Sequence, residues 1–475
     1  MAAKAAAFKR SSAVAVRNPK LQQTLHHVVR HFTEARDAAV ASEFPPETWE
    51  QMRERASSIK LQTLLNLDFY LDMVDRNVRR NGGHVHFAAD AAEANRIVLD
   101  IAKRNAVKRV IKSKSMVSEE MRLNPTLEAE GIVPVETDLG EYIIQLAKET
   151  PFHIIAPAMH KTRQDVSRLF QDWLRSAPTD DIKTLCAIAR NALRQQFATA
   201  DMGVSGANFV VAETGTVVLV TNEGNGRMTT SVPRVHVALA GMERVIPAIE
   251  DVALFLRLLP RSATGQRITS YNSFISGPRR ASDEDGPEEF HLVLVDNGRL
   301  NLLKDERLRE ALKCIRCGAC LNVCPVYQKT GGHAYGWVYP GPIGAIVTPA
   351  MNGFARGADL PFASTLCGAC KDVCPVKIDI PKLLLDLRPE AARRTGTWAE
   401  RLLMRRWVDM MRARESLERS SRLARLMQRP LSREGVIRRS RLPLLAAWTQ
   451  ARDFPAVAEK SFARRWRDGL SRAEP

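Results

Sequence analysis

Apolar residues recur at helical spacing through the first 80 residues and then give way to short alternating strands and helices. Residues 24–41 and 46–80 carry apolar positions every three or four residues, and Pro45 and Pro46 separate them. From Gly82 onward we expect strands at 84–88, 109–111, 133–136 and 153–155, and helices at 91–104, 117–123 and 141–148. This rhythm predicts parallel βαβ units, with helices covering a sheet.

The same α/β pattern continues to about residue 298. Two long helices are predicted at 162–176 and 180–199, followed by strands at 208–212, 217–221, 235–240 and 291–295. We therefore divide the chain into a helical N-terminal segment (1–80), an α/β domain (81–298), a cysteine-containing domain (299–389) and a helical C-terminal region (390–475). In the last region the pattern predicts that tryptophans anchor the packing, namely Trp398, Trp407, Trp448 and Trp466.

The positive charge of the chain is concentrated near its C-terminal end. The 475 residues carry a net charge of +17, and residues 388–475 alone hold 22 Lys and Arg against 10 Asp and Glu. Such a region could meet nucleic acid, an anionic membrane surface or an acidic partner, or it could be a solvated face of helices. No apolar run reaches the length of a membrane span, and residues 1–20 show no h-region with a cleavage site. We expect a cytoplasmic protein, with peripheral contact at the inner face of the membrane as the alternative.

The cysteines carry the clearest chemistry. Four of the eight form the run Cys314-x2-Cys317-x2-Cys320-x3-Cys324-Pro, which is the bacterial ferredoxin spacing. Three thiolates in close succession can wrap one iron–sulfur cluster. The proline turns the chain away, so the fourth thiolate faces a different cluster.

A second run repeats the first with one cysteine missing. Cys367-x2-Cys370-x3-Cys374-Pro shares the segments Cys-Gly-Ala-Cys and Val-Cys-Pro-Val with the first run, and Ser364 stands where a fourth cysteine would be. This self-similarity indicates a duplicated two-cluster module. The 42 residues from Pro325 to Leu366 are too many for a minimal ferredoxin hairpin, so we expect a mostly α-helical, ferredoxin-like domain.

Crossed ligation assigns the cysteines to two [4Fe-4S] clusters. The first cluster would take Cys314, Cys317, Cys320 and Cys374, and the second would take Cys324, Cys367 and Cys370. The fourth corner of the second cluster stays open between a Ser364 alkoxide, a water molecule and a three-iron [3Fe-4S] cluster. Zinc fits this set of cysteines poorly. The remaining Cys186 falls in a predicted helix, where we expect a buried thiol.

Three segments resemble a known family. They are 112–120 (Lys-Ser-Lys-Ser-Met-Val-Ser-Glu-Glu) with 135–141, the stretch 207–225 around Glu213-Thr-Gly-Thr, and the two cysteine runs joined by Gly-Pro-Ile-Gly at 341–344. From about residue 60 to 390 the chain resembles the iron–sulfur (B) subunit of the bacterial three-protein lactate-utilization complex.

This resemblance implies a fold and a role. The α/β domain would be similar to the sugar-isomerase and CoA-transferase superfamily. The chain would act in electron transport during oxidation of L-lactate to pyruvate, which allows growth on lactate. Its partners would be a cysteine-rich redox protein and a second protein with a related α/β domain. The chain would be a redox subunit rather than a stand-alone enzyme.

Outside the cysteines, several residues have competing interpretations. Glu213 could be the nucleophile of a CoA-transferase-like enzyme with structural clusters, but a carboxylate that fixes a turn is the preferred interpretation. Lys112 and Lys114 could hold an anionic substrate or lie in a solvated loop. Asp138 and Glu141 resemble helix-cap residues. As a metal pair, His153 and His160 lack a carboxylate or a third ligand, so we expect them to have packing roles.

Two further expectations concern the potentials of the clusters and the ligands that the chain does not bind. Lys313, Arg316 and Lys371 flank the cysteines and should raise the cluster potentials, because they favour the more negative reduced state. The sequence contains no P-loop and no GxGxxG fingerprint, so neither ATP nor a nicotinamide is expected. No recognition-helix pattern accompanies the basic C-terminal region, and nucleic-acid binding is not expected.

Overall fold

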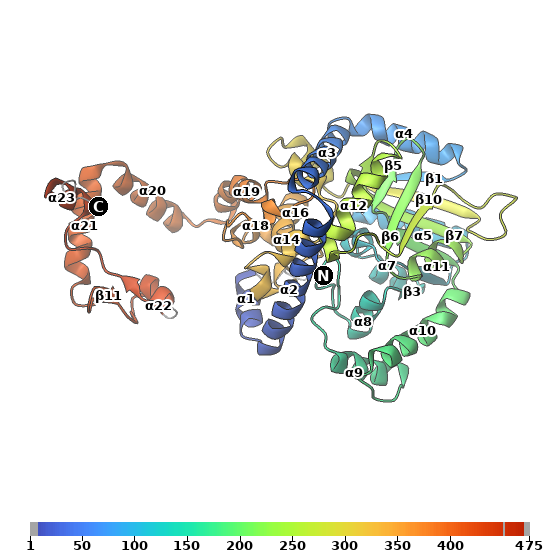
Figure 1. The fold of residues 1–475 in the computed structure, drawn as a ribbon, viewed down its shortest axis with the longest axis horizontal. Coiled ribbons are helices and arrows are strands. Elements are labelled where there is room, and N and C mark those ends of the chain that lie inside the picture. Colours follow the sequence, from blue (N-terminus) through green and yellow to red (C-terminus); the bar gives the residue numbers. More distant parts are fainter. Residues whose placement is uncertain (1–7, 450–451, 470–475) are drawn as a thin grey trace. The chain divides into compact units, whose positions relative to one another are not determined.

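The computed structural model describes residues 8–449 and 452–469. The chain divides after Thr395 into two compact units. The larger unit contains the N-terminal helices, two sheets and all the cysteines (Figure 1). The smaller unit begins at Gly396.

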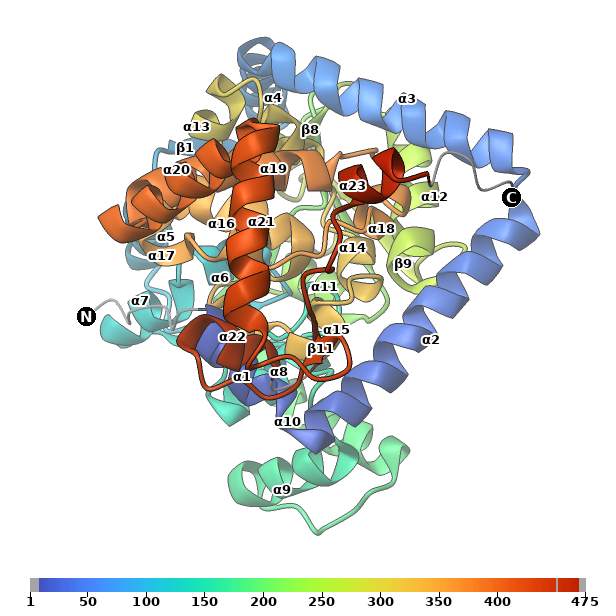
Figure 2. The ribbon, with the colours of Figure 1, turned by 90° about the vertical axis from the view of Figure 1, so that its left-hand side faces the viewer.

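Four helices precede the first strand. They are α1 (Phe8–Val16), α2 (Pro19–Glu43), α3 (Pro46–Leu65) and α4 (Leu67–Arg80). The side chain of Asn18 caps α2 by accepting the backbone N–H of Leu21 at 3.1 Å, and proline follows as the first helical residue. The predicted break at Pro45 separates α2 from α3. Figure 2 shows α2 and α3 as two long helices that meet at an angle.

The main sheet has six parallel strands in the order β1-β10-β7-β4-β2-β3. Their bounds are β1 (His84–Ala88), β2 (Arg109–Lys112), β3 (Val133–Glu136), β4 (Met202–Gly206), β7 (Val235–Gly241) and β10 (Glu289–Val295). Every residue of β4 and β7 is buried. Near-continuous burial is typical of parallel strands that are covered on both faces.

Helices cover one face of this sheet. They are α5 (Ala91–Arg104), α6 (Met116–Glu120) and α7 (Leu123–Ala129), which follow β1 and β2. The next helix, α8 (Leu139–Ala147), lies on the opposite face, where Tyr142 packs with Ile111 of β2. Apolar residues of α5, α6 and α7 pack against alternate residues of β7, among them Val235, Val237 and Leu239. The intervening Ala238 and Ala240 face a second cluster, which is formed with α4 and the smaller sheet. The parallel sheet is therefore buried between two layers.

The smaller sheet has four strands in the order β8-β5-β6-β9. They are β5 (Phe209–Val211), β6 (Thr216–Thr221), β8 (Val245–Ile246) and β9 (Tyr271–Ile275). The other elements of the α/β region are the helices α9 (Arg163–Leu174), α10 (Ile182–Ala198), α11 (Asn225–Ser231) and α12 (Asp251–Thr264), and the 3-10 turn η1 (Met242–Arg244). The sequence predicted that one α/β pattern continues through this region, and the structure divides its strands between two sheets.

The strand predicted at 153–155 is wrong. These residues form bends, because the ring of His153 binds the backbone there: its Nδ1 accepts N–H bonds from Ile155 at 3.0 Å and Ala156 at 3.2 Å. Those donors are therefore not free to join a strand ladder. The segment is nevertheless buried, with Phe152 and Ile154 each 2% exposed.

Every regular element between residues 299 and 395 is helical. The elements are α13 (Arg299–Lys304), η2 (Arg309–Lys313), α14 (Ala319–Asn322), α15 (Tyr327–Thr330), η3 (His333–Tyr335), α16 (Gly341–Asn352), α17 (Phe354–Gly357), η4 (Leu360–Phe362), α18 (Ala369–Asp372) and α19 (Ile380–Thr395). Their apolar side chains share one core with α2, α3 and α12. This core surrounds most of the cysteines.

The C-terminal unit is mainly helical. It contains α20 (Trp398–Arg412), α21 (Arg414–Gln428), α22 (Pro443–Thr449) and α23 (Phe462–Arg467), with two short paired strands, β11 (Val436–Ile437) and β12 (Phe454–Pro455). The prediction that its tryptophans anchor the packing is wrong: all four are exposed, Trp398 by 76%. The amphipathic helices α20 and α21 bury none of their residues, so the tryptophan rings stay at the surface. Within the described residues, we find no helix with the length and apolarity required to cross a bilayer.

Candidate metal centre

The two cysteine runs have the same backbone structure. Gly318 and Gly368 both adopt positive φ, at 76° and 90°, and the residues two positions earlier, Arg316 and Leu366, are also left-handed. A four-residue helix follows each glycine, α14 in the first run and α18 in the second. A Cβ at position 368 would meet no atom within 4 Å, so backbone conformation alone favours glycine there. The sequence repeat is therefore also a structural repeat with an offset of 50 residues.

Folding brings Cys374 of the second run to three cysteines of the first. Cys314, Cys317, Cys320 and Cys374 line one small cavity together with apolar side chains, including Ile343 and Ile378. Burial is the main cause that raises the pKa of Cys320, and the sulfurs of Cys314, Cys317, Cys370 and Cys374 raise it further. Such mutual effects require the sulfurs to be close in space.

The other three cysteines form a second group. Burial raises the pKa of Cys370 to about 12, and the sulfurs of Cys324 and Cys367 contribute to this shift. Cys324 and Cys370 are buried, whereas Cys367 is exposed. The Thr365 side chain lowers the pKa of Cys367 through a hydrogen bond. Because the sulfur of Cys370 also affects Cys320 of the first group, the two groups are neighbours.

Backbone N–H groups point at the sulfurs in both runs. Arg316 N–H donates to Cys314 Sγ at 3.4 Å, Tyr327 N–H to Cys324 Sγ at 3.5 Å, and Ile378 N–H to Cys374 Sγ at 3.3 Å. Hydrogen bonds of this kind stabilise negative charge on sulfur. They fit ligands that bind a metal as thiolates.

The donor set fits iron–sulfur chemistry. Burial raises the pKa of Cys374 to about 11 and raises the pKa of Cys317 as well, so the metal-free thiols hold their protons at neutral pH. Metal binding would then release protons, as for other thiolate sites. A pair of cluster sites needs apolar walls, two neighbouring groups of sulfurs and N–H donors aimed at sulfur. The cysteine region provides all three.

Ser364 occupies the position in the repeat that corresponds to Cys314. Its Oγ accepts the N–H of Leu366 at 3.1 Å, just as Cys314 Sγ accepts the N–H of Arg316. The serine is half-buried. The two side chains therefore start from matching backbone positions.

The predicted cations around the cysteines differ in their surroundings. Arg316 is buried, with Nη2 3.5 Å from Glu243 Oε1 and its guanidinium over the ring of Tyr339. Lys313 is also buried and pairs with Glu310 at 2.9 Å. Lys371 is exposed and pairs with Asp379, so solvent screens most of its charge. Their effect on cluster potentials stays a prediction.

Most candidates in the α/β domain have structural partners. Glu213 is exposed, and its Oε2 accepts the backbone N–H of Ile249 at 3.0 Å, as expected for a carboxylate that fixes a turn. Asp138 caps α8 by accepting the N–H of Glu141, which confirms its predicted role.

The two candidate lysines differ from each other. Lys112 is buried and pairs with Glu136 at 2.5 Å, so its ammonium is not free to hold a ligand. Lys114 lines a cavity beside the sheet. The solvated-loop interpretation is therefore wrong for Lys112, which ends β2, whereas Lys114 lies in the loop after β2 and is partly buried.

Cys186 corrects another expectation, because its thiol is exposed rather than buried. The buried residues of α10 are Leu185, Ala189, Leu193 and Phe197, which recur every four residues on one face. Cys186 comes one position after Leu185 and therefore points about 100° away from that face.

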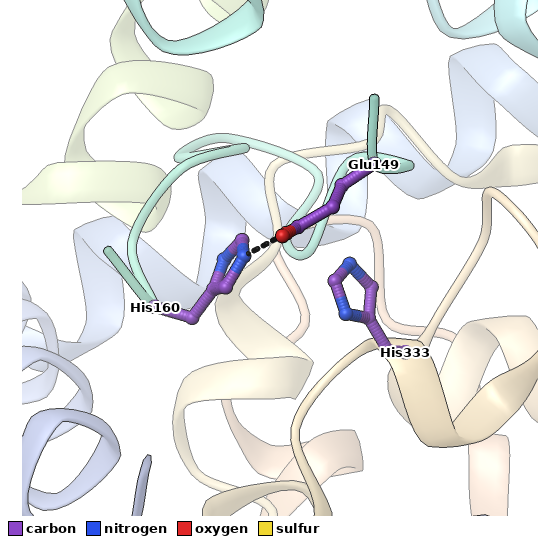
Figure 3. A group of neighbouring side chains, drawn as sticks. All are labelled: Glu149, His160 and His333. Carbon is purple, nitrogen blue, oxygen red and sulfur yellow. Dashed lines mark hydrogen bonds and ion pairs between the residues drawn. The ribbon is translucent and has the colours of Figure 1, made fainter. Parts of the chain in front are cut away.

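The expectation that His160 has no carboxylate and no third ligand beside it is wrong. Figure 3 shows Glu149, His160 and His333 pointing toward one another, and one ligand atom from each lies within 4.8 Å of the others. His160 Nε2 lies 2.7 Å from Glu149, and His333 Nε2 lies 2.7 Å from the carbonyl oxygen of Thr150. Lys161 also pairs with Glu149, so protein atoms already neutralise this carboxylate.

Comparisons with known proteins agree with this organisation. Three family models match: the LUD domain over residues 71–295, the 4Fe-4S dicluster domain over 310–378, and "Lactate utilisation protein B, C-terminal" over 389–469. A solved DUF162 family protein from Deinococcus radiodurans covers 48% of this chain and 98% of its own length, at 11% identity and a TM-score of 0.28. That structural likeness is too weak to support an argument.

Curated relatives match much more closely. Proteins named lactate utilization protein B from Bacillus licheniformis and Bacillus subtilis are each 44% identical over 421 residues, and one from Geobacillus kaustophilus is 45% identical over 422 residues. The matches cover 88% of this chain and 87–88% of each relative. This chain belongs to the lactate utilization protein B family.

Proposed function

We propose that this chain is an iron–sulfur electron carrier that serves the oxidation of L-lactate to pyruvate. The observation that carries the proposal is the gathering of seven cysteines into two neighbouring groups, each of which draws on both runs. Iron–sulfur clusters held there would accept and release single electrons. Family membership supplies the link to lactate.

The proposed ligands follow the two groups. Cys314, Cys317, Cys320 and Cys374 would hold one [4Fe-4S] cluster, and Cys324, Cys367 and Cys370 would hold three corners of the second. We propose Ser364 as the fourth ligand of the second cluster, supported by its match to Cys314 in the structural repeat. A three-iron cluster is the outcome that would replace this assignment.

Several finer features belong to the same proposal. We propose that the chain has four parts, with boundaries at residues 80, 298 and 389. We also propose that the α/β domain has a fold similar to the sugar-isomerase and CoA-transferase superfamily. The partners would be a cysteine-rich redox protein and a related α/β protein, which would exchange electrons with the clusters. We propose the cytoplasm as the location, because the cysteines are grouped for metal binding rather than spread as disulfides.

Iron analysis and EPR of anaerobically reconstituted full-length protein test the proposal. We expect about eight iron atoms per chain and two interacting paramagnetic centres after dithionite reduction. Cys317→Ala and Cys370→Ala should each lose iron and one signal, whereas Cys186→Ala should match the wild type. A colourless, iron-free wild-type protein after reconstitution would refute the proposal.

The serine ligand has its own test. Ser364→Cys should keep about eight iron atoms per chain, and Ser364→Ala should fall toward seven with a three-iron signal in the oxidised protein. Identical iron content and EPR spectra for Ser364→Ala and the wild type would exclude serine ligation. That result would leave electron transfer through two clusters intact.

A further inference from the structure

A cavity of about 280 Å³ lies at the carboxyl ends of the parallel strands. Its walls include Ser113 and Lys114, which follow β2, and Ala207 and Asn208, which follow β4. Arg244 joins them from η1, directly after β7. Its size is close to the lower end of the range for small-molecule sites.

The strand order makes this edge a favoured place for a ligand. From β2 the chain continues to β3 at the border of the sheet, whereas from β4 it continues by way of the smaller sheet to β7 on the other side. Neighbouring strands whose connections diverge leave a crevice outside their carboxyl ends, where α/β proteins bind ligands. The cavity lies at this crevice between β2 and β4.

Two arginines on its walls have N–H groups without protein partners. Arg244 Nη1, Arg316 Nε and Arg316 Nη1 make no hydrogen bond to any described residue. The two residues are only 8% and 5% exposed. A guanidinium stays charged at all working pH values, and leaving its buried donors unpaired is costly. The three atoms are themselves buried, so an anion in the cavity would satisfy them once the guanidinium groups turn toward it.

The surrounding acids do not balance this charge. Glu243 is shared, with Arg299 Nε at 2.5 Å from Oε2 and Arg316 Nη2 at 3.5 Å from Oε1. Arg299 also binds both oxygens of Glu120 at 2.8 Å. Three arginines, including Arg244, thus face two carboxylates. Lys114 also lines the cavity and adds to the positive charge, which favours an anionic ligand.

The cavity also contains two acids of its own, Asp138 and Glu223. Both are engaged at the N-terminus of α8: Asp138 accepts the N–H of Glu141 at 3.1 Å, and Glu223 accepts that of Leu139 at 3.4 Å. Burial, followed by the charge of Asp138, raises the pKa of Glu223. These carboxylates therefore serve the helix end and leave the arginines available.

The cavity adjoins the first cysteine group. Arg316 and Ile154 line both the 280 Å³ cavity and the smaller cavity of Cys314, Cys317, Cys320 and Cys374. A ligand bound to Arg316 would therefore be separated from the first cluster by the width of these side chains. A bound cluster is itself anionic and would offset part of the Arg316 charge. Arg244, which lies outside the cysteine cavity, is then the more specific anchor.

We propose that this cavity is a binding site for a small organic monocarboxylate of the 2-hydroxy or 2-oxo acid class. The carboxylate is held by Arg244 and Arg316, beside the first cluster. The nearby Ser113 and Asn208 offer hydrogen bonds to the second oxygen function of such an acid. The choice of acid rests on the proposed function, but the site itself rests on the two unpaired guanidinium groups.

Titration calorimetry on cluster-loaded, full-length protein tests the site, with L-lactate and pyruvate as probes and neutral lactamide as the control. We expect both acids to bind and lactamide to bind at least tenfold more weakly. Arg244→Gln should weaken acid binding by about tenfold to a hundredfold, because it removes a charged hydrogen bond. Arg244→Lys should recover part of the loss. Arg257→Gln, which changes an exposed arginine of α12 outside the cavity, should bind like the wild type.

Further readouts separate this proposal from the proposed function. Iron content should be the same in Arg244→Gln and the wild type, and L-lactate should change the EPR spectrum of the reduced wild type alone. If wild-type protein with full iron binds neither acid at 10 mM, or binds lactamide equally well, the site is refuted and the electron carrier stands. If Arg244→Gln loses iron, this variant no longer tests the site. The comparison of the two acids with lactamide on the wild-type protein then tests it. Binding by iron-free protein would support the site while the carrier proposal fails.

Discussion

Histidines inside the parallel sheet are kept neutral by burial. His236 on β7 is fully buried, its Nε2 lies 2.8 Å from Ser205 Oγ, and burial lowers its pKa to about 3. His86 on β1 is half-buried, and burial followed by the neighbouring His291 lowers its pKa to about 4. In the unfolded chain these rings would titrate near 6.5. The folded protein therefore binds fewer protons than the unfolded chain between about pH 4 and pH 6.5.

This difference predicts a loss of stability in mild acid. Since the unfolded state binds the extra proton, the free energy of unfolding falls as the pH drops below 6.5. For His236 the loss between pH 7.5 and pH 5 is about 2 kcal/mol. His236→Gln should remove that share of the pH dependence in urea unfolding curves, and the exposed His26→Gln serves as the control. Equal pH dependence in His236→Gln and the wild type would contradict the prediction.

At the same scale, the sequence was sufficient to name the candidate metal ligands but not Arg244. Cysteine spacing is a local property, so the candidate ligands could be named without a fold. Arg244 lies 130 residues after Lys114 in the chain, and only the sheet brings the two to one cavity. Likewise, nothing near His160 in the sequence indicates that His333 lies beside it.

At the scale of elements, the central strand β4 depends on a glycine. Gly203 packs under α11, and a Cβ at this position would come within 1.9 Å of the carbonyl oxygen of Thr229. The backbone of a helix cannot give way as a side chain can. Two glycines in Met-Gly-Val-Ser-Gly also explain why this strand was missed from the sequence, since glycine weakens the strand pattern.

Gly203→Ala should therefore be strongly destabilising. We expect a loss of about 3 kcal/mol or more, because α11 has to shift away from the sheet. Gly224→Ala is the matched control: its Cβ would meet no atom within 4 Å, and it should change stability by about 0.5 kcal/mol or less. Thermal unfolding of both variants measures the difference, and similar melting temperatures would show that the helix adapts.

Two predicted strands agree with the structure and one does not, and each outcome has a physical reason. The strand predicted at 133–136 is β3, and that at 235–240 falls within β7, because branched apolar residues mark both. The segment 153–155 has the same composition, but the His153 ring binds its backbone donors. A side chain that competes with the ladder cannot be recognised from hydrophobic pattern alone.

At the scale of the whole molecule, the division after Thr395 predicts that the larger unit is self-sufficient. The larger unit is compact and has apolar cores of its own, and α20 and α21 of the other unit bury none of their residues. A chain ending at Thr395 should keep the iron content of the full-length protein and its melting temperature within a few degrees. Iron analysis and thermal unfolding measure both, and loss of half the iron would contradict the prediction.

The N-terminal helix α3 is tied to the end of the cysteine region. Arg53 Nε donates to the carbonyl oxygen of Cys374 at 3.0 Å across 321 residues, Arg53 Nη2 donates to that of Asp372 at 2.8 Å, and Lys377 pairs with Glu50 at 2.6 Å. During synthesis, α3 leaves the ribosome roughly 16–64 s before its partners, at typical translation rates of about 5–20 residues per second. Arg53 and Glu50 lack these partners for that time, so the contact between α3 and the cysteine region can form only late in synthesis.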